Sequence, residues 1–142
     1  MEVYRDAKEI FREAIDAVLP DKAVKSALEK WEFLDNVYVV AVGKAAWKMA
    51  EVTQKLWKER IKKGIILTKY GCAKHSVEGF EIIEAGHPVP DDNSILGTQK
   101  IIDMVKNLTE EDNVIFLLSG GGSSLFELPT KGVTLKELQS VT

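Results

Sequence analysis

The sequence predicts an α/β fold in which helices cover a mainly parallel β-sheet on both faces. Four short runs rich in apolar and β-branched residues have the length of strands, and segments with a helical repeat of apolar residues separate them. Strands that alternate with helices form right-handed β-α-β units and therefore a parallel sheet. We expect a Rossmann-like three-layer α/β/α fold, and because four strands are few for such a sheet, we expect a truncated one.

The first part of the chain is expected to be helical. Apolar residues recur at three- and four-residue steps from Val3 to Val18, which predicts an amphipathic helix that stops near Pro20. A second, short helix is expected from Ala23 to Lys30, with Asp21 as its N-cap. Two aromatic residues are expected to close this helix onto the core: Trp31 and Phe33.

The remaining elements alternate between strand and helix. The expected strands are Val37–Val42, Gly64–Thr68, Phe80–Glu84 and Val114–Leu118. The third strand alternates apolar and polar residues and is expected near an edge, whereas the fourth is apolar throughout and is expected to be covered on both faces. The expected helices span residues 45–61 and 94–106, and a capping box at residues 134–137 opens another.

Composition excludes several classes of protein. The 142 residues carry a net charge of −3, which gives no electrostatic reason to expect nucleic acid or an anionic membrane as a partner. No apolar run approaches the length of a membrane span, and the charged start does not resemble a signal peptide. A single cysteine, Cys72, excludes an internal disulfide and suits a reducing compartment, so we expect a cytoplasmic protein.

The last predicted helix indicates how the chain is organised. Thr142 follows only about two turns after the capping box, and a domain rarely ends inside a freshly capped helix. We therefore expect residues 1–142 to be the partial amino-terminal α/β domain of a longer protein. The sequence leaves the oligomeric state open, a homodimer included.

A glycine-rich loop directly after the fourth strand is the main candidate site. The six residues Ser119, Gly120, Gly121, Gly122, Ser123 and Ser124 follow Leu118 without a break. Adjacent glycines let the backbone N–H groups approach a ligand closely, and N–H groups beyond the carboxyl end of a parallel strand are a usual place for phosphate. The alternative is a flexible turn with no ligand.

Lys44 is the candidate catalytic residue. It stands in the turn after the first strand and before a helix, where a positive charge opposes the helix dipole. A cation in that unfavourable place often faces an anionic ligand, although a solvated lysine would fit the same pattern.

Three further residues are weaker candidates for substrate contacts. His87 and Asp91 lie in the loop Ala85-Gly-His-Pro-Val-Pro-Asp91, which two prolines stiffen, and Lys69 directly follows the second strand. Each has a structural alternative. His87 could bind a buried carbonyl group, and Asp91 or Asp92 could cap the helix that follows. The metal ligands cannot be assigned from the sequence.

Four segments together resemble one enzyme family. They are Val42-Gly-Lys-Ala-Ala46, Thr68-Lys-Tyr-Gly71, Glu84-Ala-Gly-His-Pro-Val-Pro-Asp91 and Leu118-Ser-Gly-Gly-Gly-Ser-Ser-Leu125. With their spacing they resemble the amino-terminal part of the class II glycerate 2-kinases, a family whose carboxyl-terminal domain is called MOFRL and which was long described as hydroxypyruvate reductase.

The resemblance implies a function and a set of partners. It implies transfer of the γ-phosphoryl group of ATP, with Mg²⁺, to the 2-hydroxyl of D-glycerate. Lys44 stands where the family has its active-site lysine, and the loop from Ser119 to Ser124 stands where it has its phosphate-binding glycines. The family places its site between two domains. The acidic and arginine residues of the second domain have no counterparts here, so this fragment alone is expected to be inactive.

Two other functions compete with the kinase. An NAD-dependent hydroxypyruvate reductase predicts a G-x-G-x-x-G turn after the first strand, and the sequence there is Gly43-Lys-Ala-Ala-Trp-Lys48. A non-catalytic module that binds sugar phosphates would need only the glycine loop. The sequence also lacks the G-x-x-x-x-G-K-[ST] motif, so a P-loop kinase is excluded.

Overall fold

The computed structural model describes residues 2–31 and 35–141 and contains a four-stranded parallel sheet. The strands are β1 (Val37–Val42), β2 (Ile61–Lys69), β3 (Phe80–Ala85) and β4 (Asn113–Leu118), in the order β3-β2-β1-β4. The predicted α/β class and parallel sheet are confirmed, and β3 does lie at an edge. Because β1 is central, its carboxyl end is flanked by those of β2 and β4.

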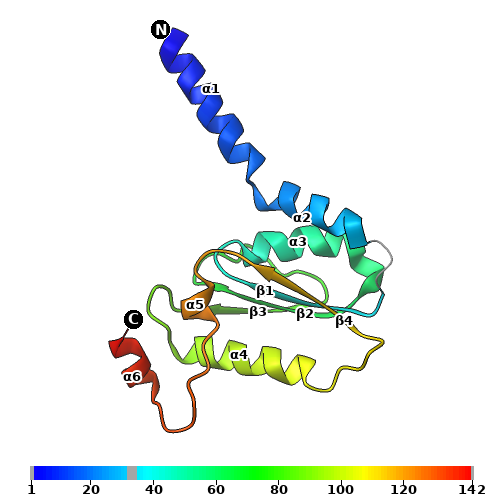
Figure 1. The fold of residues 1–142 in the computed structure, drawn as a ribbon, viewed down its shortest axis with the longest axis vertical. Helices are drawn as coiled ribbons and strands as arrows, with labels where there is room; N and C mark the ends of the chain where they lie inside the picture. Colours follow the sequence, from blue (N-terminus) through cyan, green and yellow to red (C-terminus); the bar gives the residue numbers. More distant parts are fainter. Residues whose placement is uncertain (1, 32–34, 142) are drawn as a thin grey trace.

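Helices cover the two faces of the sheet (Figure 1). One layer holds α2 (Pro20–Leu28) and α3 (Ala46–Trp57), and the other holds α4 (Asp92–Val105). The short elements are two 3₁₀ turns, η1 (Glu29–Trp31) and η2 (Lys58–Arg60), and the helices α5 (Gly122–Leu125) and α6 (Leu135–Ser140). The capping box predicted for α6 is present, because Thr134 accepts a hydrogen bond from the Glu137 N–H and Glu137 accepts one from Thr134.

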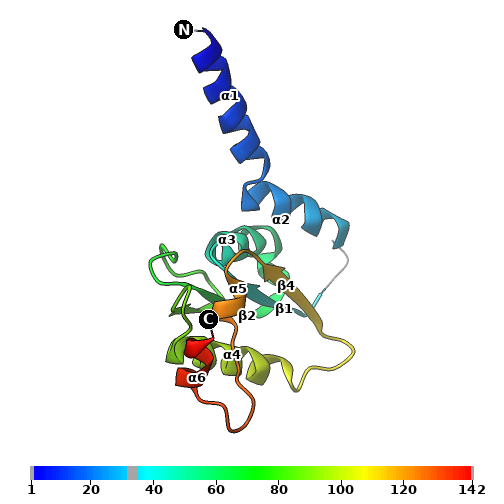
Figure 2. The ribbon, with the colours of Figure 1, turned by 60° about the vertical axis from the view of Figure 1, so that its left-hand side comes forward.

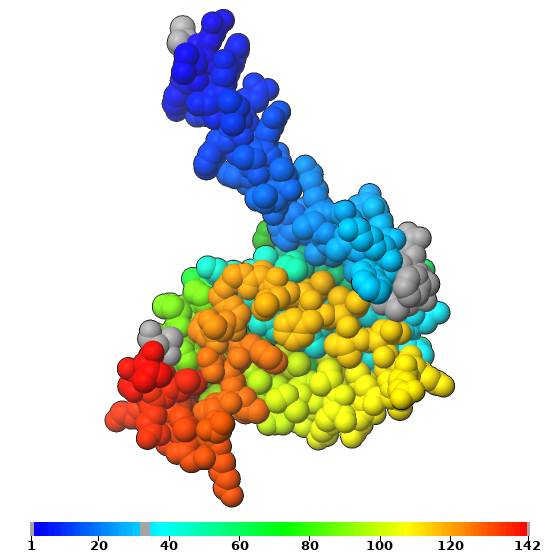
Figure 3. All heavy atoms as spheres, in the orientation of Figure 1, coloured from blue at the N-terminus to red at the C-terminus, as the bar shows by residue number. Residues whose placement is uncertain are grey.

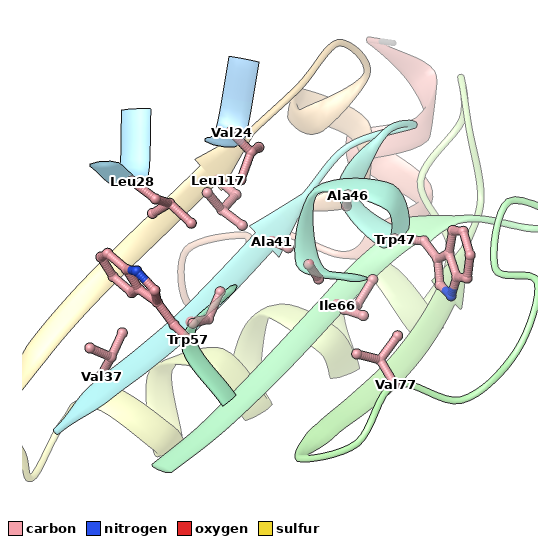
Figure 4. Packing of buried hydrophobic residues seen from close by; sticks show 12 residues of the cluster. Val24, Leu28, Val37, Ala41, Ala46, Trp47, Trp57, Ile66, Val77 and Leu117 are labelled. Carbon is pink, nitrogen blue, oxygen red and sulfur yellow. The ribbon is translucent and has the colours of Figure 1, made fainter. Parts of the chain in front are cut away.

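The core has two parts, one on each face of the sheet. On the α3 face, Trp47 and Trp57 pack with Ile66 of β2 and Leu117 of β4, and Leu28 of α2 closes the cluster (Figure 4). On the α4 face, alternate residues of β1, β2 and β3 pack against Ile101 of α4 and Leu125 of α5: Val40, Val42, Ile65, Leu67, Ile83 and Ala85. This alternation along each strand is what fixes the register of the sheet.

Several predicted details near the amino terminus were wrong. The helix α2 begins at Pro20, with Leu19 in the N-cap position and no side-chain cap, so Asp21 lies inside the first turn. Proline favours the first helical position because its missing N–H would be unpaired there anyway. Trp31, expected to close the helix onto the core, is 50% exposed, and Phe33 lies outside the described residues.

The helix α3 is shorter than predicted. It ends at Trp57, the 3₁₀ turn η2 follows, and β2 begins at Ile61, where a helix was still expected. The strand pairs with β1 from Val37↔Ile61 onward. Pairing with a neighbouring strand therefore decides the conformation of residues 61–63, which the local apolar pattern does not.

The strand β4 is covered on one face only, which corrects the expectation of burial on both. Leu117 is buried against the α3 layer, but Val114, Phe116 and Leu118 on the opposite face are 46%, 46% and 64% exposed. Figure 3 shows this segment and the loop after it at the surface of the molecule. The continuous apolar run is typical of a strand that is buried on both faces. One face of β4 is nevertheless exposed, because α4 covers β2 and β3 rather than β4.

The helix α1 (Glu2–Ala17) extends away from the sheet, as the two ribbon views agree (Figures 1 and 2). Its amphipathic pattern was predicted, but none of its residues is buried, and Phe11 is 67% exposed. Among the described residues, no helix is both long and apolar enough to cross a membrane.

Candidate functional site

The candidate site lies at the carboxyl end of the sheet, where two loops meet. β1 and β4 are neighbours and end in register, with Val42 paired to Leu118. The loop after β1 carries Lys44, and the loop after β4 is the glycine-rich segment. The position at the carboxyl ends of parallel strands is the one at which α/β proteins bind ligands.

The loop after β1 uses its backbone N–H groups within the protein. The N–H of Gly43 donates to Leu67 O (3.1 Å), that of Lys44 to Gly120 O (3.0 Å) and that of Ala45 to Ser119 Oγ (3.0 Å). The N–H of Ala46 donates back to Gly43 O at 3.2 Å. The start of α3 therefore has none of these four donors left for an anion.

Gly43 is required by the close approach of the two loops. Its φ is +114°, and a Cβ atom at this position would lie 2.5 Å from the carbonyl oxygen of Ser119 and still nearer its Oγ. The carbonyl of Gly43 also accepts a hydrogen bond from Thr68 Oγ1 at 2.9 Å. Residue 43 thus joins β1, β2 and the loop after β4 with no space for a side chain.

The loop after β4 leaves its glycine N–H groups open. Within the described residues, the N–H groups of Gly120, Gly121 and Gly122 meet no acceptor. Gly121 has φ of +90°, a conformation that favours glycine. This loop therefore offers the run of unpaired donors that the sequence predicts.

The three serines of this loop differ in their roles. The Ser119 hydroxyl accepts from Ala45 N and donates to Val42 O at 3.3 Å, so it links the two loops. The Ser124 hydroxyl is buried and donates to Gly121 O at 3.4 Å. Ser123 is exposed. Ser119 and Ser124 hold the shape of the loop, and of the three hydroxyls that of Ser123 is open to a ligand.

The side chain of Lys44 reaches the glycine loop. Its Cε atom is 3.4 Å from the place that a Cβ of Gly121 would occupy, and 4.0 Å from the corresponding place at Gly120. Lys44 is exposed, and its ammonium has no hydrogen-bond or ion-pair partner among the residues that the structure describes. An unpaired positive charge thus stands beside unpaired N–H donors, as expected at a site for a negatively charged ligand.

His87 lies at the same place. Its Nε2 atom is 2.6 Å from the position that a Cβ of Gly121 would occupy, so the imidazole rests against the loop beside Lys44. The peptide bond between His87 and Pro88 is cis. The structure therefore brings together three of the predicted features, which are Lys44, His87 and the glycine loop.

The Asp91 carboxylate accepts hydrogen bonds from the start of α4 and from Tyr70, directly after β2. Its Oδ1 accepts from Ser94 N at 3.1 Å and caps α4, and its Oδ2 accepts from the Tyr70 hydroxyl at 2.8 Å. Partial burial works against ionisation of Asp91, but the hydrogen bonds from Tyr70, Gly86 and Ser94 outweigh it and hold its pKa below the ordinary value. The same bond raises the pKa of Tyr70.

The predicted capping role of Asp91 is therefore confirmed. Asn93 completes the group by donating to Tyr70 Oη and to Glu84 O, both at 2.9 Å. Tyr70 was not singled out from the sequence, and it ties the end of β2 to the loop that carries His87. Lys69 is exposed at the last position of β2, beside Ala85 in the register, and makes no described contact with the glycine loop.

A cavity of about 450 Å³ opens beside Lys44. Its walls come from the start of α2, the start of α3 and the loop after β2: Leu19, Pro20, Asp21, Lys44, Trp47, Lys48, Gly71, Cys72 and Lys74. The sequence analysis did not identify it. A usable signal was the spacing of Lys44, Trp47 and Lys48, which places all three on one side of a helix start. In the described part of the chain, no three His, Cys, Asp or Glu side chains are placed to hold a metal ion.

Comparison with known proteins places this arrangement in a family. The family described as "Domain of unknown function (DUF4147)" matches residues 6–142, almost the whole chain. The chain belongs to the DUF4147 family.

This DUF4147 chain is homologous to glycerate 2-kinases, as the resemblance predicts. A D-glycerate 2-kinase from Thermotoga maritima is 53% identical over 96% of the chain and 32% of the relative. A putative hydroxypyruvate reductase from Agrobacterium vitis is 38% identical over 95% of the chain and 31% of the relative. The crystal structure of glycerate kinase from Thermotoga maritima matches with a TM-score of 0.93 and 51% identity, covering 99% of this chain and 34% of that one. The chain thus spans about a third of the length of these relatives.

Proposed function

We propose that this chain is the amino-terminal part of a two-domain cytoplasmic kinase that converts ATP and D-glycerate to ADP and 2-phosphoglycerate. The observation that carries the proposal is the convergence of the unpaired Lys44 ammonium with the open N–H groups of Gly120 to Gly122. It occurs in a chain homologous to D-glycerate 2-kinases. The second domain of the proposed kinase would close the site from the other side.

The reaction needs charge stabilisation and positioning more than covalent chemistry. The 2-hydroxyl oxygen of D-glycerate forms a bond to the γ-phosphorus while the bond from that phosphorus to the β,γ-bridging oxygen breaks. The bonding electron pair leaves with ADP, and the hydroxyl proton passes to a base. His87 is the candidate base in this chain because its imidazole lies against Gly121, beside Lys44.

In this proposal the transferring phosphoryl group lies over the glycine loop. The N–H groups of Gly120 to Gly122 and the Ser123 hydroxyl would donate to its oxygens, and Lys44 would neutralise the charge that develops on them. These donors are held in place before the substrate arrives, because Ser119 and Ser124 fix the loop through their own hydrogen bonds. No described cluster of carboxylates fits a magnesium ion, so in the proposal Mg²⁺ enters with the phosphates of ATP.

A chimeric enzyme tests the proposal. The chain replaces the homologous segment of the Thermotoga maritima D-glycerate 2-kinase, which is 32% of that relative and 53% identical to this chain. We expect the chimera to form 2-phosphoglycerate from ATP, Mg²⁺ and D-glycerate, and Lys44→Ala to lower kcat/KM by about 100-fold or more. Lys63→Ala serves as the control and should leave activity unchanged, because Lys63 lies near the amino end of β2 and the site lies at the carboxyl ends of the strands. A folded chimera without product would contradict the kinase, and a Lys44→Ala value within about tenfold of the parent would remove Lys44 from the mechanism.

A hydroxypyruvate reductase is the second candidate, and the name of the Agrobacterium vitis relative favours it. Its nicotinamide cofactor would need free N–H groups after β1 for the pyrophosphate. The hydrogen bonds of Gly43 to Ala46 within the protein argue against this. Incubation of the same chimera with NADH and hydroxypyruvate discriminates the two, because only the reductase oxidises NADH. A non-catalytic module would bind phosphorylated ligands and yield neither product.

A further inference from the structure

From the cavity beside Lys44 we infer which part of the site holds the nucleotide, an inference that rests on the proposed kinase function. We propose that the cavity between α2, α3 and the loop after β2 binds the nucleoside and inner phosphates of ATP. D-glycerate is then left to the opposite side of Lys44, next to His87. The argument uses the position, charge and size of the cavity.

The position of the cavity makes it continuous with the glycine loop. Lys44 belongs to both, because it lines the cavity and its Cε atom lies against Gly121. A ligand that places its terminal phosphate over the loop would therefore extend past Lys44 into the cavity. His87 does not line the cavity, although it touches the same glycine.

The walls of the cavity carry a positive excess. Three lysines line it, namely Lys44, Lys48 and Lys74, against one carboxylate, Asp21. Lys48 is paired with Glu51 at 2.8 Å, but the same carboxylate also holds Lys55 at 2.6 Å. The single negative charge of Glu51 is thus shared between Lys48 and Lys55. It therefore does not remove the positive excess of the cavity wall. Such a wall attracts a polyphosphate more strongly than a neutral ligand.

The wall next to these lysines is apolar and already in place. Leu19, Pro20 and Trp47 contribute to it. Trp47 is buried, its Nε1 donates to His75 O at 2.9 Å, and its ring meets the His75 ring edge to face with 4.7 Å between centroids. A preformed apolar surface beside an electropositive one suits a molecule that has a flat apolar part and a charged tail.

The size of the cavity fits a nucleotide better than it fits D-glycerate. At about 450 Å³ it falls within the usual range of pockets for nucleotide-sized ligands. D-glycerate, with three carbon atoms, would leave most of this volume empty and would meet the apolar wall with hydroxyl and carboxylate groups, which is unfavourable. The nucleotide is therefore the better match for the cavity.

Cys72 provides a direct reporter, because it is the only cysteine of the chain, lines the cavity and is partly exposed. The experiment measures the rate at which iodoacetamide alkylates Cys72 in the 142-residue chain and in the chimera, followed by the mass of the peptide that contains it. We expect saturating MgATP or ADP to slow alkylation about fivefold or more, since the bound ligand would cover the thiol. Saturating D-glycerate should change the rate less than about twofold.

Charge variants sharpen this experiment. Lys74→Gln should raise the ATP concentration for half-maximal protection about threefold or more, and Lys63→Gln, far from the cavity, should not. Protection by D-glycerate but not by ATP, or no protection in a chimera that forms 2-phosphoglycerate, would overturn the inference while the kinase function stands. A chimera that gives neither product nor protection would overturn both.

Discussion

The loops after β1 and after β4 occupy equivalent places in the fold but use their backbone N–H groups in opposite ways. Both follow neighbouring parallel strands that end in register. The N–H groups of Gly43 to Ala46 are bonded within the protein, whereas those of Gly120 to Gly122 meet no described acceptor. A place at the carboxyl edge of a sheet therefore does not by itself make an anion site. The donors must also be unpaired.

Glycine has a different purpose in each loop. Gly43 is needed because a side chain would collide with Ser119, so it serves packing. Gly121 adopts a conformation that favours glycine and lets the His87 imidazole lie against the loop beside Lys44, so it serves the assembly of the site. One loop closes the structure, and the other presents the donors. Substitutions that affect one loop and not the other test this division.

The largest effect is expected from Gly43→Ala. The new methyl group would lie 2.5 Å from the backbone oxygen of Ser119, and φ at this residue is +114°. We expect a loss of about 3 kcal/mol or more in the free energy of unfolding, measured by urea denaturation. Gly71→Ala is the matched control, because φ there is +78° and no atom lies within 4 Å of the new Cβ. Equal losses in both variants would show that the contact with Ser119 has no cost of its own.

Ser119→Ala should have the next largest effect. It removes the acceptor of the Ala45 N–H and the donor to Val42 O. Losing both partners in a partly buried junction should cost about 1–3 kcal/mol in thermal or urea unfolding. Ser123→Ala, in the same loop but exposed, should change stability by less than about 0.5 kcal/mol. If both serines behaved alike, Ser119 would not be the link between the loops.

Gly121→Ala should affect the site more than the fold. The methyl group would meet the end of the His87 side chain, which can move aside, so the cost in stability should stay near 1–2 kcal/mol. In the chimera, kcat/KM for D-glycerate should fall at least about tenfold, because the His87 imidazole is displaced. Gly79→Ala, at φ of +82° with open space around it, should lower stability alone. Unchanged activity in Gly121→Ala would argue against a site at this loop.

The smallest effect is expected from Asp91→Asn, and it depends on pH. Hydrogen bonds keep the pKa of Asp91 below its ordinary value in the folded protein. A carboxyl group whose pKa is lowered by folding stabilises the fold at pH values above its pKa in the unfolded chain, which is about 3.9. This stabilisation is lost as the pH falls through the lower pKa that the group has in the folded protein. Wild type and variant should therefore differ in unfolding midpoint at pH 6 and converge below about pH 3. A difference that stays constant over this range would contradict the assignment.

Local patterns in the sequence were sufficient to locate the four strands and the two loops, although not the first three residues of β2. The apolar runs fix the strands, and alternation with helices fixes the parallel sheet. The position of Lys44 in the turn after β1 then brings it next to the loop after β4, because β1 and β4 are neighbours. Periodicity and turn composition are properties of nearby residues, which is why they could be read from the chain.

What could not be predicted depends on residues far apart in the sequence. The hydrogen bond from Ala45 N to Ser119 Oγ joins residues 74 positions apart, and it is what removes one donor from the start of α3. The exposed face of β4 likewise depends on which strands α4 covers. The bond from Tyr70 to Asp91 joins residues 21 positions apart and depends in the same way on how β2 and the loop after β3 are placed. Partners of this kind become visible only once the fold is known.

The most direct test of the account is a titration of the ¹⁵N-labelled chain with MgATP, following each backbone amide by NMR. We expect the N–H resonances of Gly120, Gly121 and Gly122 to shift in a saturable manner and by more than those of Gly43 to Ala46, whose donors are already bonded within the protein. Lys44→Ala should weaken the response of the glycine loop. Shifts at Gly43 to Ala46 with none at Gly120 to Gly122 would contradict the central claim.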